Sequence, residues 1–372
     1  MTGLASVRGE HAARIAWARL VEPGDLDLAA RISAVGAEQA LHAVGDESTL
    51  AARVAPRLGG LDVDRDLEIA RTLGARLLFP GDEEWPPGLD DLAAPPLCLW
   101  AVGSAHLGEA AARSVAVVGA RAATGYGSHV AKELAAGLAE RRFAVVSGAA
   151  YGIDGAAHEG ALAVSGETVA VVAGGIDRPY PGGHTGLLSR IREGGLVVSE
   201  VPPGSAPTKW RFLSRNRVIA TLTQGTVVVE AGLRSGSRNT ARLAGEHLRV
   251  VCAVPGPLTS AVSAGCHELI RAGAILVTDA AEVVEAVGPT GELAPRKAGE
   301  VRPGDDLEPR QRIVLAALQP RTPLLPEEVA RRCGLSSAEV SSALGVLDLE
   351  GLVERRPEGW HRSKAVTRGD NP

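Results

Sequence analysis

The chain has 372 residues, of which 45% are hydrophobic and 22% are charged, and its formal net charge is −5. These values are typical of a globular protein with two or three domains, and they exclude a largely disordered or fibrous chain. An acidic balance also argues against a protein that wraps nucleic acid through its overall charge. Any nucleic-acid site would therefore have to be local and basic.

Cysteine usage and hydropathy limit the class of protein further. The four cysteines are scattered and form no Cys-x-x-Cys pair, so we expect no disulfide framework, no bound metal and no cofactor. No uncharged apolar run approaches the roughly 18 residues of a membrane helix. Arg8, Glu10 and Arg14 interrupt the N-terminus where a signal sequence would be apolar. We expect a cytoplasmic protein with no membrane partner.

Residues 1–80 are predicted to form a small helical domain of the SAM or helix-hairpin-helix type. Apolar residues recur at helical spacing in short segments that Pro and Gly separate. The nine basic and eleven acidic side chains of this region do not favour DNA. We therefore favour a packing role over DNA contact. The predicted helical segments are His11–Leu20, Leu26–Val35, Ala37–Val44 and Leu67–Leu73.

Residues 81–287 are predicted to form a Rossmann-like α/β domain. A Pro-rich connector comes first, and from Arg113 onward short β-branched runs alternate with helical segments. Val-rich strands separated by helices indicate a doubly wound, mostly parallel sheet, with ligands bound beyond the carboxyl ends of its strands. The predicted strands are Val115–Val118, Ala144–Val146, Thr168–Val172, Leu196–Val198, Thr226–Val229, Val250–Ala253 and Ile275–Val277.

The end of the chain is predicted to be a linker, residues 288–306, followed by a winged-helix domain, residues 307–364. Three helical segments precede a β-hairpin, and Ser336 or Ser337 would cap the third helix. A winged helix used on DNA is normally basic, but the stretch from Asp305 to Lys364 holds nine basic and ten acidic side chains. We expect it to contact protein or to be auxiliary. The helical segments are Ile313–Leu318, Pro326–Cys333 and Ser337–Glu350.

The segment Lys209–Arg217 is the most informative of the chain. It contains four positive charges and two aromatic rings, and between Pro207 and Arg242 seven basic side chains accompany a single acidic one. Cations bind phosphate oxygens and rings stack on bases, so this segment suits single-stranded nucleic acid. We expect it to be a loop between two strands, where α/β folds build their sites.

Two glycine-rich turns that open helices are predicted to bind phosphate. The first contains Gly119 and Arg121 and continues through Thr124–Gly127, and the second extends from Arg234 to Thr240. Exposed backbone N–H groups and the helix dipole favour an anion at such places. The first turn has neither the dinucleotide-binding spacing nor that of a P-loop, and a purely structural glycine turn stays an alternative.

Asp154 and His158 form the one candidate acid–base pair for catalysis. They lie one helical turn apart, at the start of a predicted helix. No Ser, Cys or second carboxylate is placed to complete a triad, so we favour a capping Asp with a His on the same helix face. We expect no catalytic site.

The ordered motifs between about residues 85 and 280 resemble the DNA-processing protein A family (DprA, also called Smf). The flanking helical and winged-helix domains resemble the architecture of the same family. The matching motifs are Gly119-x-Arg121, Thr124-x-Tyr126-Gly127, Ser147-Gly148 with Gly152-Ile153-Asp154 and Ala157-His158, Gly174-Gly175-Ile176-Asp177 with Tyr180-Pro181, Ser199-Glu200-x-Pro202, Phe212-x-x-Arg215-Asn216-Arg217, Glu230-Ala231, Ser235-Gly236-Ser237 with Thr240-Ala241, Ala253-Val254-Pro255-Gly256 and Leu269-Ile270 with Gly273-Ala274.

The resemblance implies a protein that binds single-stranded DNA without cleaving it. Such proteins protect incoming strands during natural transformation and load the recombinase RecA onto them, and they usually dimerise through the Rossmann-like domain. By motif match, Arg121, Lys209 and Phe212 would be the main DNA contacts. The complete predicted DNA-binding set is Gly119, Arg121, Ser147, Gly148, Lys209, Phe212, Arg215, Asn216, Arg217, Ser235, Gly236, Ser237, Arg238 and Thr240.

Two other functions are alternatives. Rossmann-like nucleotide phosphoribohydrolases carry Pro-Gly-Gly-x-Gly-Thr followed by a catalytic Glu. The segment Pro181–Gly186 reads Pro-Gly-Gly-His-Thr-Gly and lacks both the second glycine before Thr and the Glu after it. The other alternative, a winged-helix transcription factor with a sensor domain, is disfavoured by the acidic balance of the last domain.

Overall fold

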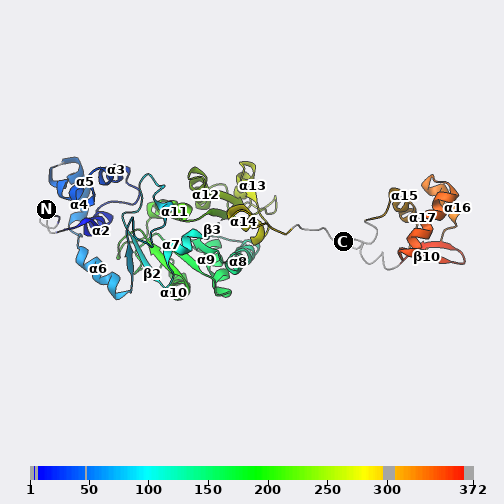
Figure 1. Ribbon diagram of the computed structural model, residues 1–372, viewed down its shortest axis with the longest axis horizontal. Helices are drawn as coiled ribbons and strands as arrows, with labels where there is room; N and C mark the ends of the chain where they lie inside the picture. The colour runs from blue at the N-terminus through cyan, green and yellow to red at the C-terminus, as the bar shows by residue number, and fades with distance from the viewer. Residues whose placement is uncertain (1–3, 5–6, 47, 296–305, 364–372) are drawn as a thin grey trace. The chain divides into compact units, whose positions relative to one another are not determined.

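The computed structural model describes residues 4, 7–46, 48–295 and 306–363, and it divides into two compact units, Met1–Ala294 and Pro295–Pro372. The first unit contains the N-terminal helices and the large sheet, and the second contains the helices and hairpin near the C-terminus (Figure 1). None of the described helices is long and apolar enough to cross a membrane. Among the described residues, no cluster of His, Cys, Asp or Glu is arranged to hold a metal ion.

The N-terminal region is helical, as predicted. The fully buried Trp17 lies at its centre and donates its indole N–H to the Ala37 carbonyl at 3.0 Å. The helix over residues 48–58 was not predicted. Only Leu50 and Val54 of it are buried, and Pro56 lies inside it, so its apolar pattern is short. The helices are α2 Glu10–Leu20, α3 Leu26–Val35, α4 Ala37–His42, α5 Ser48–Leu58 and α6 Val63–Thr72.

A nine-stranded sheet forms the body of the first unit, with the order β1-β2-β6-β5-β4-β3-β7-β8-β9. The seven strands from β3 to β9 are parallel to their neighbours among themselves, which confirms the predicted fold class. The strands are β1 Arg76–Leu78, β2 Leu99–Gly103, β3 Ser114–Val118, β4 Ala144–Ser147, β5 Thr168–Val172, β6 Leu196–Ser199, β7 Gly225–Val228, β8 Val250–Ala253 and β9 Ile275–Leu276.

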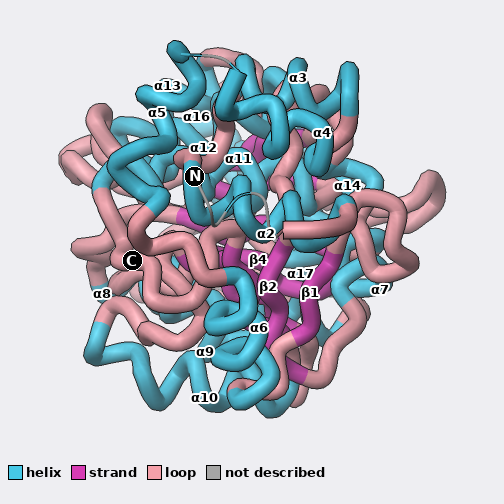
Figure 2. Tube along the Cα trace, turned by 90° about the vertical axis from the view of Figure 1, so that its left-hand side faces the viewer, coloured by secondary structure: helices cyan, strands magenta, loops and turns pink. Residues whose placement is uncertain are grey.

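Strand β1 lies at the end of the region predicted to be helical, and β2 lies in the segment predicted to be a Pro-rich connector, so both correct the prediction. They pair antiparallel with each other, and β2 also pairs antiparallel with β6, so they extend one edge of the sheet (Figure 2). Neither strand stood out in the sequence, because each is short and prolines precede β2. The side chain of Trp100 on β2 is nevertheless fully buried, so this edge is part of the core.

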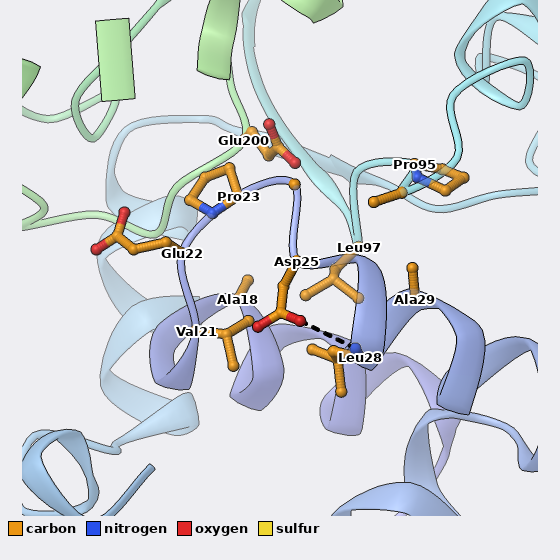
Figure 3. A pocket seen from close by; sticks show the side chains of 12 residues that line it. Ala18, Val21, Glu22, Pro23, Asp25, Leu28, Ala29, Pro95, Leu97 and Glu200 are labelled. Atoms are coloured by element: carbon orange, nitrogen blue, oxygen red, sulfur yellow. Dashed lines mark hydrogen bonds between the residues drawn. The ribbon is translucent and has the colours of Figure 1, made fainter. Parts of the chain in front are cut away.

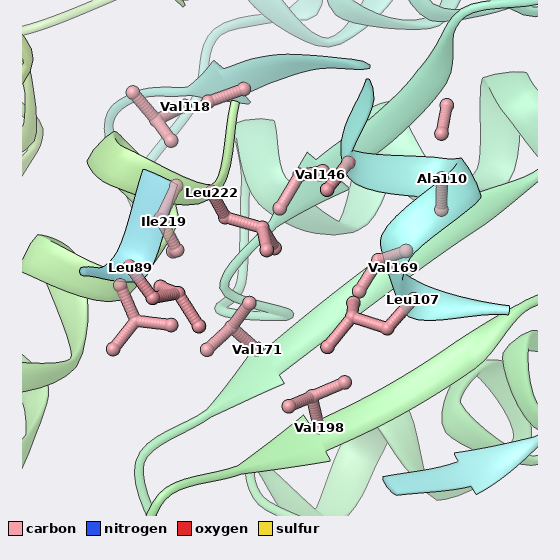
Figure 4. Close-up of a cluster of buried hydrophobic side chains, with 14 of the residues drawn as sticks. Leu89, Leu107, Ala110, Val118, Val146, Val169, Val171, Val198, Ile219 and Leu222 are labelled. Atoms are coloured by element: carbon pink, nitrogen blue, oxygen red, sulfur yellow. The ribbon is translucent and has the colours of Figure 1, made fainter. Parts of the chain in front are cut away.

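Helices cover both faces of the sheet because the side chains of each strand alternate between them. On β3, Ala116 and Val118 face one hydrophobic cluster, and Val115 and Val117 face another. The first cluster includes buried side chains of α7, α11 and α12, as Figure 4 shows in part. The helices of this region are α7 Leu107–Ala112, α8 Gly125–Glu140, α9 Ile153–Ala163, α10 Thr185–Gly194, α11 Lys209–Leu222, α12 Gly236–Glu246, α13 Ala264–Arg271 and α14 Ala280–Val287.

The segment Lys209–Arg217 is the beginning of helix α11 and not a loop, which corrects the prediction. Thr208 caps the helix, since its side chain accepts a hydrogen bond from the Arg211 N–H at 3.2 Å. Every residue from Arg215 to Leu222 is buried. A helix buried all round lacks an apolar stripe with a period of 3.6 residues, so this part of the sequence carries no amphipathic helical signal.

The second unit has the predicted winged-helix plan. Helices α15 Pro309–Ala317, α16 Pro326–Cys333 and α17 Ser337–Leu349 are followed by a hairpin of β10 Val353–Arg356 and β11 Gly359–Arg362. Ser336, rather than Ser337, caps α17. Its hydroxyl accepts from the Glu339 N–H at 3.3 Å, and the Glu339 carboxylate accepts from the Ser336 N–H at 2.9 Å. This reciprocal arrangement is a capping box.

Candidate nucleic-acid interface

A cleft of about 820 Å³ opens at the carboxyl ends of the strands. It lies where the strand order reverses: from β3 the chain crosses to β4 on one side, and from β7 it crosses to β8 on the other. Open α/β sheets bind ligands at such a switch point because the two diverging connections leave a crevice between them. The cleft is lined by residues that follow β3 and β7, by Asp154 near the start of α9, by Tyr180, and by the first turns of α11 and α12.

Ten of the fourteen predicted DNA-binding residues line this cleft, although they come from three separate segments of the chain. The cleft is lined by four basic side chains and one acidic side chain, so it is locally basic although the whole chain has a net charge of −5. The four predicted residues that do not line the cleft are Ser147, Gly148, Arg217 and Arg238. The ten lining residues are Gly119, Arg121, Lys209, Phe212, Arg215, Asn216, Ser235, Gly236, Ser237 and Thr240.

Arg121, Phe212 and Tyr180 form a cationic and aromatic cluster in the cleft. The Arg121 guanidinium lies over the Phe212 ring, 4.7 Å from its centre. The Tyr180 ring lies 5.6 Å from the Phe212 ring and is tilted by 53°. Arg121 and Lys209 are both exposed, and neither pairs with an acidic side chain of the described residues. These groups suit a ligand that is anionic along one side and planar along the other.

The N-terminus of α12 is open to the cleft. Ser235 is its N-cap, and the Ser235 and Ser237 hydroxyl oxygens lie 2.7 Å apart. Gly236 and Thr240 line the same wall, and the exposed Arg234 lies directly before the cap. Backbone N–H groups, hydroxyls and a guanidinium together favour phosphate oxygens at this place. This turn therefore fits the phosphate-binding role that its sequence predicted.

The other predicted phosphate turn is filled by a side chain of the protein itself, which corrects the prediction for Thr124–Gly127. The buried Glu230 carboxylate accepts hydrogen bonds from the Thr124 N–H at 2.9 Å and from its hydroxyl at 2.6 Å. A Cβ on Gly127 would lie 2.2 Å from a Glu230 oxygen, so Gly127 gives the carboxylate its space. An internal anion thus occupies the N-terminus of α8, where we expected an external one.

Arg215 reaches the floor of the cleft from α11 and is buried. Its guanidinium donates to the Val171 carbonyl. Burial lowers the pKa of Arg215 to about 10, while the Asp154 carboxylate opposes this shift and Arg121 adds to it. A pKa of about 10 still leaves the group cationic at neutral pH. Arg215 thus contributes positive charge beneath the cleft from a fixed position.

Ser147 and Gly148 support Arg215 and the sheet rather than the cleft surface. The Ser147 hydroxyl is buried and donates to the Val117 carbonyl at 2.7 Å. A Cβ on Gly148 would lie 2.0 Å from a guanidinium nitrogen of Arg215. The sequence pattern Ser147-Gly148 therefore indicates a place where an arginine passes close to the backbone.

The remaining basic residues of the segment Pro207–Arg242 are largely engaged within the protein. Arg211 binds Glu22 at 2.9 Å, Arg217 binds Glu200, and Arg242 binds Glu246. Arg238 donates to the Leu233 carbonyl. The large positive excess counted along this segment is therefore not all available to a ligand. The exposed cations that line the cleft are Arg121, Lys209 and Arg234.

Asp154 and His158 do not form an acid–base couple. Asp154 accepts hydrogen bonds from the N–H groups of Gly148 at 3.2 Å and Ala150 at 3.4 Å, and burial raises its pKa. It is not the cap of α9 that we expected, because Gly152 holds that position. His158 is fully buried, and its Nδ1 lies 2.7 Å from the Thr168 hydroxyl.

Two residues that line the cleft, Tyr180 and Arg234, were absent from the predicted set. Tyr180 is about half exposed and faces Phe212, and Arg234 lies at the cap of α12. Each had a sequence signal, since Tyr180 belongs to the Tyr-Pro motif and Arg234 was counted in the basic segment. Trp210, which is aromatic and exposed, does not line the cleft.

Comparisons with known proteins agree with this fold. The family described as DNA recombination-mediator protein A matches residues 76–288, and the DprA winged helix domain matches residues 298–359. The putative DNA processing protein DprA of Mycobacterium tuberculosis is 48% identical to this chain, and the match covers 94% of each chain.

Two solved structures are also similar. The X-ray structure of DprA from Streptococcus pneumoniae has a TM-score of 0.63 and 31% identity, and covers 74% of this chain and 97% of its own. DNA processing protein A from Helicobacter pylori, described for its single-stranded DNA binding mode, has a TM-score of 0.51 and 30% identity, with 56% and 94% covered. From these matches, the chain belongs to the DprA/Smf family of DNA recombination-mediator proteins.

Proposed function

We propose that this protein binds single-stranded DNA in the switch-point cleft, without cutting it, and passes it to a RecA-type recombinase. The observation that carries the DNA part of the proposal is the convergence of Arg121, Lys209 and Phe212 with the open N-terminus of α12 in one cleft. The Helicobacter pylori relative is described by its single-stranded DNA binding mode. The recombinase, the link to natural transformation and a cytoplasmic location rest on the family resemblance.

The arrangement suits the backbone of an extended strand. Phosphate oxygens would bind Arg121, Lys209 and Arg234 and the N–H groups at the start of α12, which releases the counterions of the DNA. A base would stack on the exposed faces of Tyr180 and Phe212, where every base offers a π-face. Neither kind of contact reads a sequence, so we propose binding that tolerates any sequence.

The test is the fluorescence anisotropy of a labelled single-stranded oligonucleotide over a series of salt concentrations, with a duplex for comparison. The double variant Arg121→Ala/Lys209→Ala should bind much more weakly, and the slope of log affinity against log salt should fall by about 0.7 for each phosphate that the variant no longer neutralises. Arg190→Ala is the matched control, since it removes an exposed charge of α10 that does not line the cleft. Equal affinity of the double variant and the wild type would refute this cleft as the DNA site.

We also propose a homodimer formed through the outer edge of β9. This strand ends the sheet, and its residues Ile275 and Leu276 are each nearly half exposed, while Leu248 beside the adjoining strand is almost fully exposed. An open apolar edge strand favours pairing with another chain. Light scattering after size exclusion should give twice the chain mass for the wild type and a monomer for Leu276→Glu. A monomeric wild type at micromolar concentration would contradict the proposal.

The phosphoribohydrolase alternative makes a different prediction. Such an enzyme would release a free base from a nucleoside monophosphate, and the chain would then need an acid–base group in the cleft. The buried Asp154 is the acidic side chain that lines it, and its carboxylate is held by two backbone N–H groups. We expect no base release above the buffer blank, as followed by chromatography of the nucleotide.

A further inference from the structure

Helix α11 begins with positively charged side chains at the end of the helix that already carries a partial positive charge. Its first turn, Lys209–Phe212, contains two cations and no acidic residue. The N-terminus of a helix carries a partial positive charge, so cations there destabilise the first turn and an anion would stabilise it. Lys209 and Phe212 both line the cleft, so the position of this turn decides where two of the proposed DNA contacts lie.

The missing anion comes from the N-terminal helical region. Glu22, in the turn between α2 and α3, accepts from the Arg211 Nε at 2.9 Å and from its Nη2 at 3.1 Å. This bidentate geometry fixes the guanidinium in direction as well as distance. Arg57 of α5 also binds Glu22, at 2.6 Å, but the two bonds from Arg211 do not involve it. Glu22 thus links the turn between α2 and α3 to the first turn of α11.

Two further contacts place the end of α2 and the following turn against α11 and the segment that leads into it. Arg19 of α2 donates to the Pro203 carbonyl at 2.8 Å, shortly before α11 begins. A Cβ on Gly24 would lie 3.5 Å from the Nε of Arg217, so the turn passes close to a second arginine of α11. Figure 3 shows Glu22 and Pro23 on this turn, and Glu200, the partner of Arg217, near Pro23; the three residues line one small cavity.

We propose that Glu22 is a positioning residue for the DNA cleft, through which the N-terminal helical region holds the first turn of α11 in its binding conformation. Glu22 does not line the cleft, and Arg211, which lies between Lys209 and Phe212 in sequence, transmits its effect. The inference rests on the proposed function, and it assigns the acidic N-terminal region a role in binding DNA without contact to DNA.

The direction in which Glu22→Gln changes the DNA affinity distinguishes a positioning role of Glu22 from a direct electrostatic effect on DNA. Glu22→Gln removes a negative charge near a site for a polyanion, so a purely Coulombic effect would strengthen DNA binding. Loss of the anion that stabilises α11 would instead weaken binding, by roughly fivefold. The matched control is Arg57→Ala, which removes the other cation bound to Glu22 and leaves the pair with Arg211 intact.

The experiment measures two properties of the full chain with each substitution. Hydrogen exchange of the protein without DNA should show faster exchange of the amides of residues 211–213 in Glu22→Gln, because the Arg211 and Phe212 amides donate to Thr208 at the start of the helix, and unchanged exchange in Arg57→Ala. Anisotropy should show weaker binding of a single-stranded oligonucleotide by Glu22→Gln alone. Unchanged exchange at the start of α11, or equal or tighter binding by Glu22→Gln, would overturn the inference. Failure of the wild type to bind would instead remove the proposed function, and the exchange measurement would still decide whether Glu22 holds α11.

Discussion

The Arg121 guanidinium lies 4.7 Å from the centre of the Phe212 ring, so a residue that follows β3 and a residue of α11 form one cation–aromatic pair in the cleft. The pair holds a charge for phosphate beside a flat apolar surface for a base. Because Tyr180 approaches the same ring from a third segment, Phe212 is the residue on which the cluster is built.

Phe212→Leu should therefore weaken single-stranded DNA binding by about tenfold, because base–aromatic stacking contributes roughly 1–3 kcal/mol per base. The slope of log affinity against log salt should not change, since the ring carries no charge. Trp210→Leu is the matched control, an exposed aromatic on the same helix turn that does not line the cleft. Equally weakened binding by the two variants, measured by anisotropy, would contradict a specific role for Phe212.

Gly148→Ala should destabilise the protein, although the sequence motif suggested a DNA contact at this glycine. The new Cβ would lie 2.0 Å from the Arg215 guanidinium, so the arginine would have to leave its buried position. We expect a decrease of about 2 kcal/mol or more in the free energy of unfolding, measured in urea. Gly125→Ala is the control, because a Cβ at that first residue of α8 meets no atom within 4 Å. Similar stability of both variants would show that the site can adapt.

The parallel strands were the most predictable part of the fold. Strands β3 to β8 were placed within one residue at each end because they are buried on both faces and consist of nearly continuous Val-rich runs. Strand β1 was missed because it has only three residues and follows a run of predicted helices, and β2 was missed because the prolines near it are typical of a connector. The start of helix α11 was predicted to be a loop. Complete burial of the second half of this helix removes the amphipathic period by which a helix is recognised in a sequence.

The sequence predicted which basic and glycine-rich segments form the candidate site, but not which of their basic side chains pair with acidic side chains of the protein itself. The sequence identified the basic segment and the cap of α12, and both line the cleft. It did not show that Arg211 and Arg217 pair with Glu22 and Glu200, or that Glu230 fills the start of α8, because those partners lie up to 189 residues away along the chain. Net charge along a segment therefore overstated the charge available to a ligand.

Acid should destabilise the fold through His158. Burial lowers the pKa of His158 to about 3, and its Nε2 has no hydrogen-bond partner among the described residues. An unfolded chain would protonate this imidazole near its ordinary pKa of about 6.5, so it binds more protons than the folded chain between about pH 6.5 and 3. The contribution of the neutral His158 to the free energy of unfolding is therefore fully present above about pH 6.5. It is lost as the pH falls toward 3, by at most about 1.4 kcal/mol per pH unit.

His158→Gln should make the free energy of unfolding less dependent on pH over this interval, as measured by urea unfolding at a series of pH values. Gln cannot take up a proton, so it removes the difference between the folded and unfolded states. His129→Gln replaces a histidine of α8 that is not buried and should leave the dependence unchanged. A wild-type dependence that persists in His158→Gln would assign the acid sensitivity to other groups.

Ser336→Ala should destabilise the winged-helix unit by about 1 kcal/mol, because the Ser336 hydroxyl and the Glu339 carboxylate together form the capping box of α17. Ser337→Ala, one residue later at the first helical position, should have almost no effect, since Ser337 is exposed. Hydrogen exchange of the α17 amides, measured on the full chain, reports on this unit separately from the sheet. If both substitutions accelerated exchange equally, the cap would not be specific to Ser336. If neither did, α17 would be held by its buried side chains Val340, Leu344 and Leu347 without help from its cap.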